Sequence, residues 1–155
     1  MKKINFFLIL FVFTLSACGF KSASQVSKER FTIAEVVVTG EKKTGNQIRN
    51  EIMLSSGKNS VNLLFLTMNI EKIKQIKERD EKNKVTKYQT TLVADIFIQN
   101  NKDQNKKNYS ISNSLDYVVE KNYSDTLKNE KNAIDNLVNK TAKDIYTNLS
   151  LDYFN

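Results

Sequence analysis

The stretch "KVTKYQTTLVADIFIQNNKDQNKKNYSISNSLDYVV" (84–119) contains two runs in which apolar and polar residues alternate, with a polar segment between them. Successive side chains of a β-strand point to opposite faces, so this alternation predicts strands with one buried face. In the first run, 84–99, that face consists of Tyr88, Leu92, Ala94, Ile96 and Ile98. In the second run, 109–119, it consists of Tyr109, Ile111, Leu115 and Tyr117. Across the polar loop 100–108, the two strands are expected to form an antiparallel hairpin.

The segment before this hairpin, "VNLLFLTMNIEKIKQIKER" (61–79), fits two patterns. Its first half alternates as a strand does, whereas Ile70, Ile73 and Ile76 have the spacing of a helix. We predict one long strand with a bulge or bend near Glu71. Whether residues 70–79 are strand or helix stays open at this point.

Two further elements are expected upstream. "FTIAEVVVT" (31–39) is rich in β-branched residues and predicts a largely buried first strand. "TGNQIRNEIMLSSG" (44–57) predicts a short helix, which a capping box of Thr44 and Gln47 would begin and Gly57 would end. One face of this helix should lie on the sheet and consist of Ile48 and Ile52, with Met53 beside them.

The last segment, from about Ser124 to Leu149, predicts a long amphipathic helix. Its apolar stripe consists of Leu127, Ile134, Leu137, Val138, Thr141, Ile145 and Leu149. A stripe at this spacing is more often part of the core than a partner-binding face. The predicted order is therefore βαβββα, an α+β fold in which two helices pack on one face of a four-stranded, mostly antiparallel sheet.

The N-terminal 17 residues have the order of a secretory signal peptide: two lysines, an apolar run of about ten residues, and small residues before Cys18. That run is shorter than the roughly 20 residues that span a bilayer. Leu15-Ser16-Ala17-Cys18 resembles the bacterial lipobox, in which the cysteine is acylated and becomes the first mature residue. We expect 1–17 to be removed, 18–30 to be lipid anchor and tether, and 31–155 to be one domain. The alternatives are an ordinary signal peptide with an incidental cysteine, or a buried helix.

The residue inventory limits the chemistry. Cys18 is the only cysteine and the chain has no histidine, which excludes an internal disulfide and the Ser–His and Cys–His nucleophilic systems. No glycine-rich phosphate loop occurs. A Ser–Lys or paired-carboxylate enzyme stays open, but no spacing supports one. We expect a binding or structural protein without catalytic residues, metal or cofactor.

Charge indicates the class of partner. Without residues 1–17 the chain has 22 basic and 17 acidic side chains, a formal charge of +5. For an exported protein this favours anionic surfaces such as lipid phosphates, and nucleic acid is not an expected partner. In lipobox proteins an aspartate after the cysteine commonly means retention in the inner membrane. Gly19 stands there instead, which favours the outer membrane.

Taken together, the lipobox, the "NQIRNEI" helix with Arg49-Asn50, the "KYQTTLVADIFI" strand with Tyr88-Gln89, and the terminal amphipathic helix resemble the LPS-assembly lipoprotein family, LptE. The resemblance implies a lipid-anchored protein on the periplasmic side of the outer membrane. Such a protein plugs an LptD-type β-barrel and helps insert lipopolysaccharide into the outer leaflet. How many acyl chains Cys18 carries is not fixed by it.

If the chain also touches lipopolysaccharide, lipid A phosphates are the natural target of its basic groups. The candidate patch lies in the turn 77–87 and consists of Arg79, Lys82, Lys84 and Lys87. The plain alternative is a solvated loop, since three acidic residues in the same turn offset much of the charge. Arg49 and Asn50 have a similar alternative, a helix-surface pair that fixes local packing. The competing functions are an accessory or lipid-carrier lipoprotein of another outer-membrane machine, and a secreted hydrolase.

Overall fold

The computed structural model describes residues 31–58, 60–101 and 106–152. The elements are, in chain order, β1 (Thr32–Gly40), α3 (Lys42–Ser55), β2 (Leu63–Arg79), β3 (Val85–Asn100), β4 (Lys106–Val118) and α4 (Tyr123–Asp152). The predicted signal peptide, Cys18 and the tether lie outside the described residues. Among the described residues, no helix is long and apolar enough to cross a membrane.

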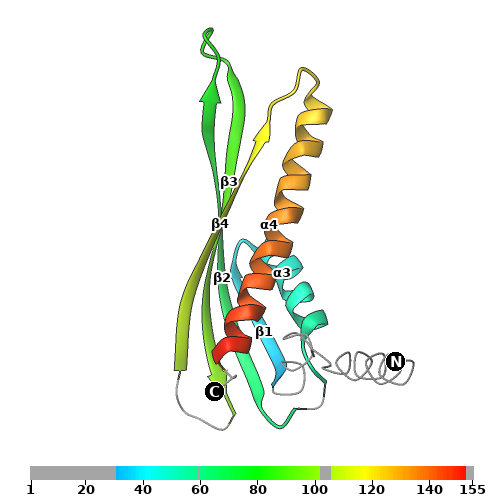
Figure 1. Ribbon diagram of the computed structural model, residues 1–155, viewed down its shortest axis with the longest axis vertical. Coiled ribbons are helices and arrows are strands. Elements are labelled where there is room, and N and C mark those ends of the chain that lie inside the picture. Colours follow the sequence, from blue (N-terminus) through cyan, green and yellow to red (C-terminus); the bar gives the residue numbers. More distant parts are fainter. Residues whose placement is uncertain (1–30, 59, 102–105, 153–155) are drawn as a thin grey trace, which may run out of the picture.

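The four strands form one sheet in the order β1-β2-β3-β4. β1 runs parallel to β2, while β2–β3 and β3–β4 are antiparallel. Both helices pack on the same face, α3 against β1 and β2 and α4 against β3 and β4 (Figure 1). The predicted α+β fold, with two helices on one face of a mostly antiparallel sheet, is confirmed.

The core lies between this inner face and the helices. All side chains of the apolar alternation on β3 from Leu92 to Ile98 are at most 2% exposed. They meet a matching row on β2, and the helices supply the opposite wall with Ile48, Ile52, Leu137, Ile145 and Leu149. The apolar residues of the β3 alternation and most of those in the helical stripe are therefore buried, as predicted.

β2 is a strand over its whole length, and the predicted irregularity near Glu71 is wrong. Pairing with β3 continues in register through Glu71↔Val93, and the register shifts lie between Ile76 and Arg79. β1 ends opposite Ile70, where the core also ends. Ile73 and Ile76 point to opposite faces of the strand and are partly exposed. The helix-like spacing of the three isoleucines therefore arises because β2 has left the core, and it does not indicate a helix.

Beyond Ile70, β2 has no strand on its β1 side in the part of the chain that the structure describes. An open edge of this kind invites pairing with another chain. Lysines at 72, 74 and 77 and the bulge near Lys77 are features that discourage such pairing.

The start of α3 differs from the prediction. The N-cap is Glu41, whose carboxylate accepts a hydrogen bond from the Thr44 backbone N–H at 2.6 Å. Thr44 lies inside the helix and is only 1% exposed, so the Thr44–Gln47 capping box is wrong. The cause is the tight turn before the helix. Gly40 has φ of 76°, and the Glu41 N–H donates to the Ile70 carbonyl at 2.8 Å.

The end of α3 also differs. The helix ends at Ser55 and its C-cap is Ser56, whose N–H donates to the Met53 carbonyl and whose hydroxyl accepts from the Ile33 N–H at 2.8 Å. Gly57 does not adopt a left-handed conformation. Met53 is 40% exposed and does not lie with Ile48 and Ile52 on the sheet. Contact with β1, and not a glycine cap, therefore stops the helix.

α4 is fixed against β4 by a polar cluster inside the interface. The Asn113 amide donates to the Thr141 hydroxyl at 3.2 Å and to the Asp144 carboxylate at 2.9 Å, and Lys140 donates to the Asn113 amide oxygen. Asn113 and Thr141 are 5% and 0% exposed. Leu127, predicted for the apolar stripe, is 45% exposed, because the first turns of α4 extend past the core.

Gly40→Ala should destabilise the protein. A Cβ at Gly40 would lie 2.2 Å from the Ile70 carbonyl oxygen, and the left-handed backbone alone costs a non-glycine residue about 1–2 kcal/mol. We expect urea unfolding to show a loss of at least this size. The matched control is Gly57→Ala, which should change the free energy of unfolding by less than about 0.5 kcal/mol. Equal losses in the two variants would contradict the turn described here.

Candidate functional site

The end of the β2–β3 hairpin, residues 77–87, is called the tip below, and its turn is held by its own side chains. The Asp80 carboxylate accepts from the backbone N–H groups of Lys82 and Lys84 at 3.0 and 2.8 Å. The Asn83 N–H donates to the Asp80 carbonyl at 2.9 Å, and Asn83 has φ of 61°. Asparagine tolerates this left-handed conformation. The turn is thus ordered without help from the core, and it presents its lysines to solvent.

The structure brings three of the four predicted basic residues together. The Arg79 guanidinium donates to the Asn83 carbonyl at 2.8 Å, which places it against the turn. Lys82 and Lys84 are exposed and have no ion-pair partner among the described residues. Lys87 instead lies along β3, 2.9 Å from the Glu78 carboxylate. The hydrogen bond and charge of Glu78 raise the pKa of Lys87. Lys87 therefore stays charged, and the Glu78 carboxylate offsets its charge.

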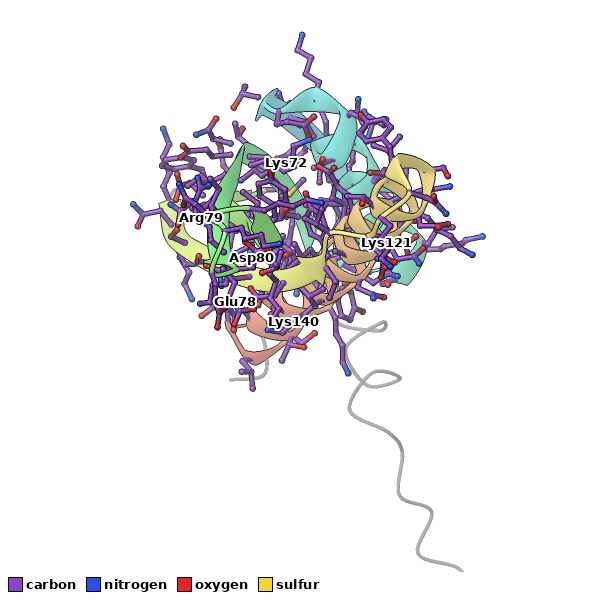
Figure 2. All side chains as sticks on the ribbon, turned by 90° about the horizontal axis from the view of Figure 1, so that it is seen from above. Lys72, Glu78, Arg79, Asp80, Lys121 and Lys140 are labelled. Carbon is purple, nitrogen blue, oxygen red and sulfur yellow. The ribbon has the colours of Figure 1, made fainter. Side chains whose placement is uncertain are left out.

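The tip has a small excess of positive charge. It contains five basic and three acidic side chains. Figure 2, which looks onto this end, shows Glu78, Arg79 and Asp80 at the hairpin and Lys121 across from them, on the connection into α4. Lys121 was not among the predicted basic residues, because it joins this end only through the pairing of β3 with β4. No local motif could have identified it.

Below the tip, a cluster called the Lys74 clamp joins the sheet to α4. The Lys74 ammonium lies 3.1 Å from both carboxylate oxygens of Glu130. It also lies 4.5 Å from the ring centroid of Tyr88 and 5.3 Å from that of Tyr117. The two rings are 5.7 Å apart. Ammonium groups are attracted to the faces of aromatic rings, so this contact adds to the ion pair.

The electrostatics of the clamp keep Lys74 charged. Partial burial lowers the pKa of Lys74, but Tyr117 and Glu130 outweigh this effect and raise it. Burial likewise raises the pKa of the Tyr117 phenol. The clamp could have been anticipated from the sequence, because Lys74 has the same strand parity as Leu66 and had to face α4. Because lysine is hydrophilic, the apolar pattern did not identify Lys74 as an inward-facing residue.

Thr90 lies in register with Lys74 on the same inner face. It is 1% exposed, and its hydroxyl has no hydrogen-bond partner among the described groups. An unpaired buried hydroxyl costs stability. Not every buried polar group at the edge of the core therefore has a hydrogen-bond partner.

The remaining features are open hollows and helix-surface residues. One hollow of about 350 Å³ lies on the uncovered outer face of the sheet beside Asn69, Asp95 and Phe97. Two more lie near the start of β4, with volumes of about 580 and 290 Å³. No group of three potential metal ligands occurs in the described ranges. Arg49 and Asn50 lie on α3, away from the tip.

No family model matches the sequence, and no curated protein matches it significantly. Solved structures do share its fold. The crystal structure of rare lipoprotein B from Shewanella oneidensis aligns with a TM-score of 0.57 at 11% identity, over 76% of this chain and 95% of that one. The solution NMR structure of uncharacterized lipoprotein B from Nitrosomonas europaea aligns with a TM-score of 0.53 at 13% identity, over 85% and 90%. The chain therefore has the fold of these two proteins.

Replacing Thr90 by valine should leave stability unchanged or raise it by up to about 1 kcal/mol, because the change removes an unpaired buried hydroxyl at constant shape. The same replacement at Thr141, whose hydroxyl accepts from Asn113, should cost about 1 kcal/mol. Urea unfolding of the two variants measures both changes. A loss at Thr90 as large as the loss at Thr141 would show that the Thr90 hydroxyl has a partner.

Proposed function

We propose that this chain is a non-catalytic outer-membrane lipoprotein that plugs an LptD-type β-barrel and assists lipopolysaccharide insertion. The observation that carries the proposal is the shared fold with two lipoprotein B structures over most of the chain, preceded by a lipobox-like Leu15–Cys18. The shared fold and the lipobox-like segment support each other. A lipid anchor explains the lone cysteine, and the fold matches proteins called lipoproteins.

The uncovered outer face of the sheet suits a plug. It carries a group of hydroxyl and amide side chains, Thr67, Asn69, Gln89, Thr91, Asn108, Ser110, Ser112 and Ser114, beside the charged Glu71, Asp95 and Asp116 and the aromatic Phe65 and Phe97. Two cross-strand contacts order this face: the hydroxyls of Thr91 and Ser114 lie 2.7 Å apart, and the Gln89 amide donates to the Asp116 carboxylate at 2.9 Å. The interior of a membrane β-barrel is polar. The hydrogen-bonding part of this sheet face can therefore contact such a wall.

Affinity purification of the tagged lipoprotein from detergent-solubilised envelopes tests the partner. We expect a large outer-membrane β-barrel to copurify in stoichiometric amount, and the intact mass of the bait to correspond to cleavage before an acylated Cys18. The control is Cys18→Ser, which should lose both the processing and the membrane association. A preparation that lacks any barrel would contradict the plug, even if the acylation is found.

The tip is the proposed contact with lipid A phosphates. Replacing Arg79, Lys82 and Lys84 together by serine should weaken lipopolysaccharide binding roughly tenfold, since each exposed charge pair contributes up to about 1 kcal/mol. Lys87→Ser should change binding less, because Glu78 already holds that ammonium. Binding can be measured by titration with purified lipopolysaccharide.

A charge-matched control separates a local site from general attraction. Replacing the exposed Lys42, Lys43 and Lys143 by serine removes the same charge from the two helices. Binding that falls equally in both triple variants would mean that net charge alone attracts the ligand. Unchanged binding in the tip variant would eliminate the tip as the site.

A further inference from the structure

The end of the molecule opposite the tip, called the base, is where the element ends meet. It comprises the start of β1, the end of α3, the β2 start, the β3–β4 end and the end of α4 (Figure 1). Hydrogen bonds from Ile33 to Ser56 and from Leu63 to Asn101 tie these segments together. Phe31, the first described residue, is fully buried there. The N-terminal 30 residues therefore join the domain at the base.

Exposed apolar side chains are concentrated at the base. Of the eleven large hydrophobic residues that are exposed in the described ranges, six belong to it, so the enrichment is not a property of the whole surface. They are Met53, Leu54, Val61, Phe65, Phe97 and Leu151. Leu54, Val61 and Leu151 are 78%, 74% and 63% exposed, which leaves most of their apolar surface in water. A rim of this kind indicates an interaction surface.

Basic groups accompany the apolar rim. Lys106 lines two hollows, one of about 290 Å³ with Phe65 and Phe97 and one of about 580 Å³ with Leu151 and Lys107. Lys58 and Lys106 are exposed without an ion-pair partner in the described part of the chain, whereas Lys107 lies 3.2 Å from Asp152. Lysines beside exposed aromatic and aliphatic side chains match the phosphate and acyl boundary of a lipid layer.

We infer that the base is a docking surface for an anionic phospholipid bilayer, which it occupies when the chain is not inside a barrel. The inference rests on the proposed lipid anchor. Cys18 precedes Phe31 by 13 residues, which span at most roughly 45 Å. The 17 residues of β2 separate base from tip by about 55 Å. An acylated Cys18 therefore keeps the base within roughly 45 Å of the bilayer, and the base is the end nearer to the attachment point.

The chain lacks tryptophan, so a single introduced indole reports its own depth. The protein, isolated from envelopes in the form that the cell processes, is reconstituted in vesicles of phosphatidylcholine and phosphatidylglycerol with brominated acyl chains, which quench nearby indoles. In Phe97→Trp, and separately in Leu54→Trp, emission should fall about twofold or more, because the side chain lies about 5–10 Å into the headgroup boundary. Ile76→Trp is the matched control: Ile76 is 47% exposed against 53% for Phe97, and it should remain unquenched.

The outcomes separate the inference from the proposed function. A protein that stays out of the vesicle fraction has no lipid anchor, and both proposals fall. A protein that partitions with the vesicles but shows no quenching at Phe97→Trp and Leu54→Trp has the anchor without base docking, and the inference alone falls. Equal quenching of these indoles and of Ile76→Trp also overturns it. So does a blue shift of the base indoles that follows protein concentration without vesicles, since a second copy would then cover the base.

Discussion

The continuous pairing of β2 with β3 is the constraint on which the rest of the structure depends. Over its first half β2 also pairs with β1, and its inward-facing side chains, Leu64, Leu66, Met68 and Ile70, are buried under the helices. Beyond Ile70 the same strand continues with β3 alone. Since side chains alternate without interruption from one half to the other, the inner face changes from core to charged surface along a single rigid ribbon.

That ribbon gives the molecule two different ends. The tip is built from a turn that satisfies its own hydrogen bonds and needs no core beneath it, so Lys82 and Lys84 stay exposed. The Lys74 clamp fixes the ribbon to α4 at the level where apolar packing ends. The base contains the ends of several strands and helices, the exposed apolar rim and Phe31, the first described residue. The β2–β3 ladder holds these two ends at a fixed separation.

Much of the fold could be predicted from the sequence. The alternation on β3 and β4 and the stripe on α4 arise because apolar residues occupy the buried positions, so residue type alone indicates which positions are buried. The capping box at Thr44 is wrong because a different acceptor, Glu41, caps the helix. The Gly40 turn and the hydrogen bond from the Glu41 N–H to the Ile70 carbonyl, 29 residues away in the chain, place Glu41 there. Lys74 was missed because a paired lysine can face inward. For the candidate site, Arg79, Lys82 and Lys84 were predictable from local composition, whereas the pairing of Lys87 and the position of Lys121 depend on tertiary structure.

Residue-resolved amide hydrogen exchange by NMR tests most directly whether β2 is one strand with a free upper edge. Backbone groups of successive strand residues point to alternate edges, and the Ile70 carbonyl faces the β1 side. The N–H groups of Ile73 and Gln75 should therefore be protected by β3, while those of Lys72 and Lys74 should exchange quickly. Equal protection of all four would mean that the upper edge is covered. Rapid exchange of all four would mean that the ribbon between base and tip is not a strand.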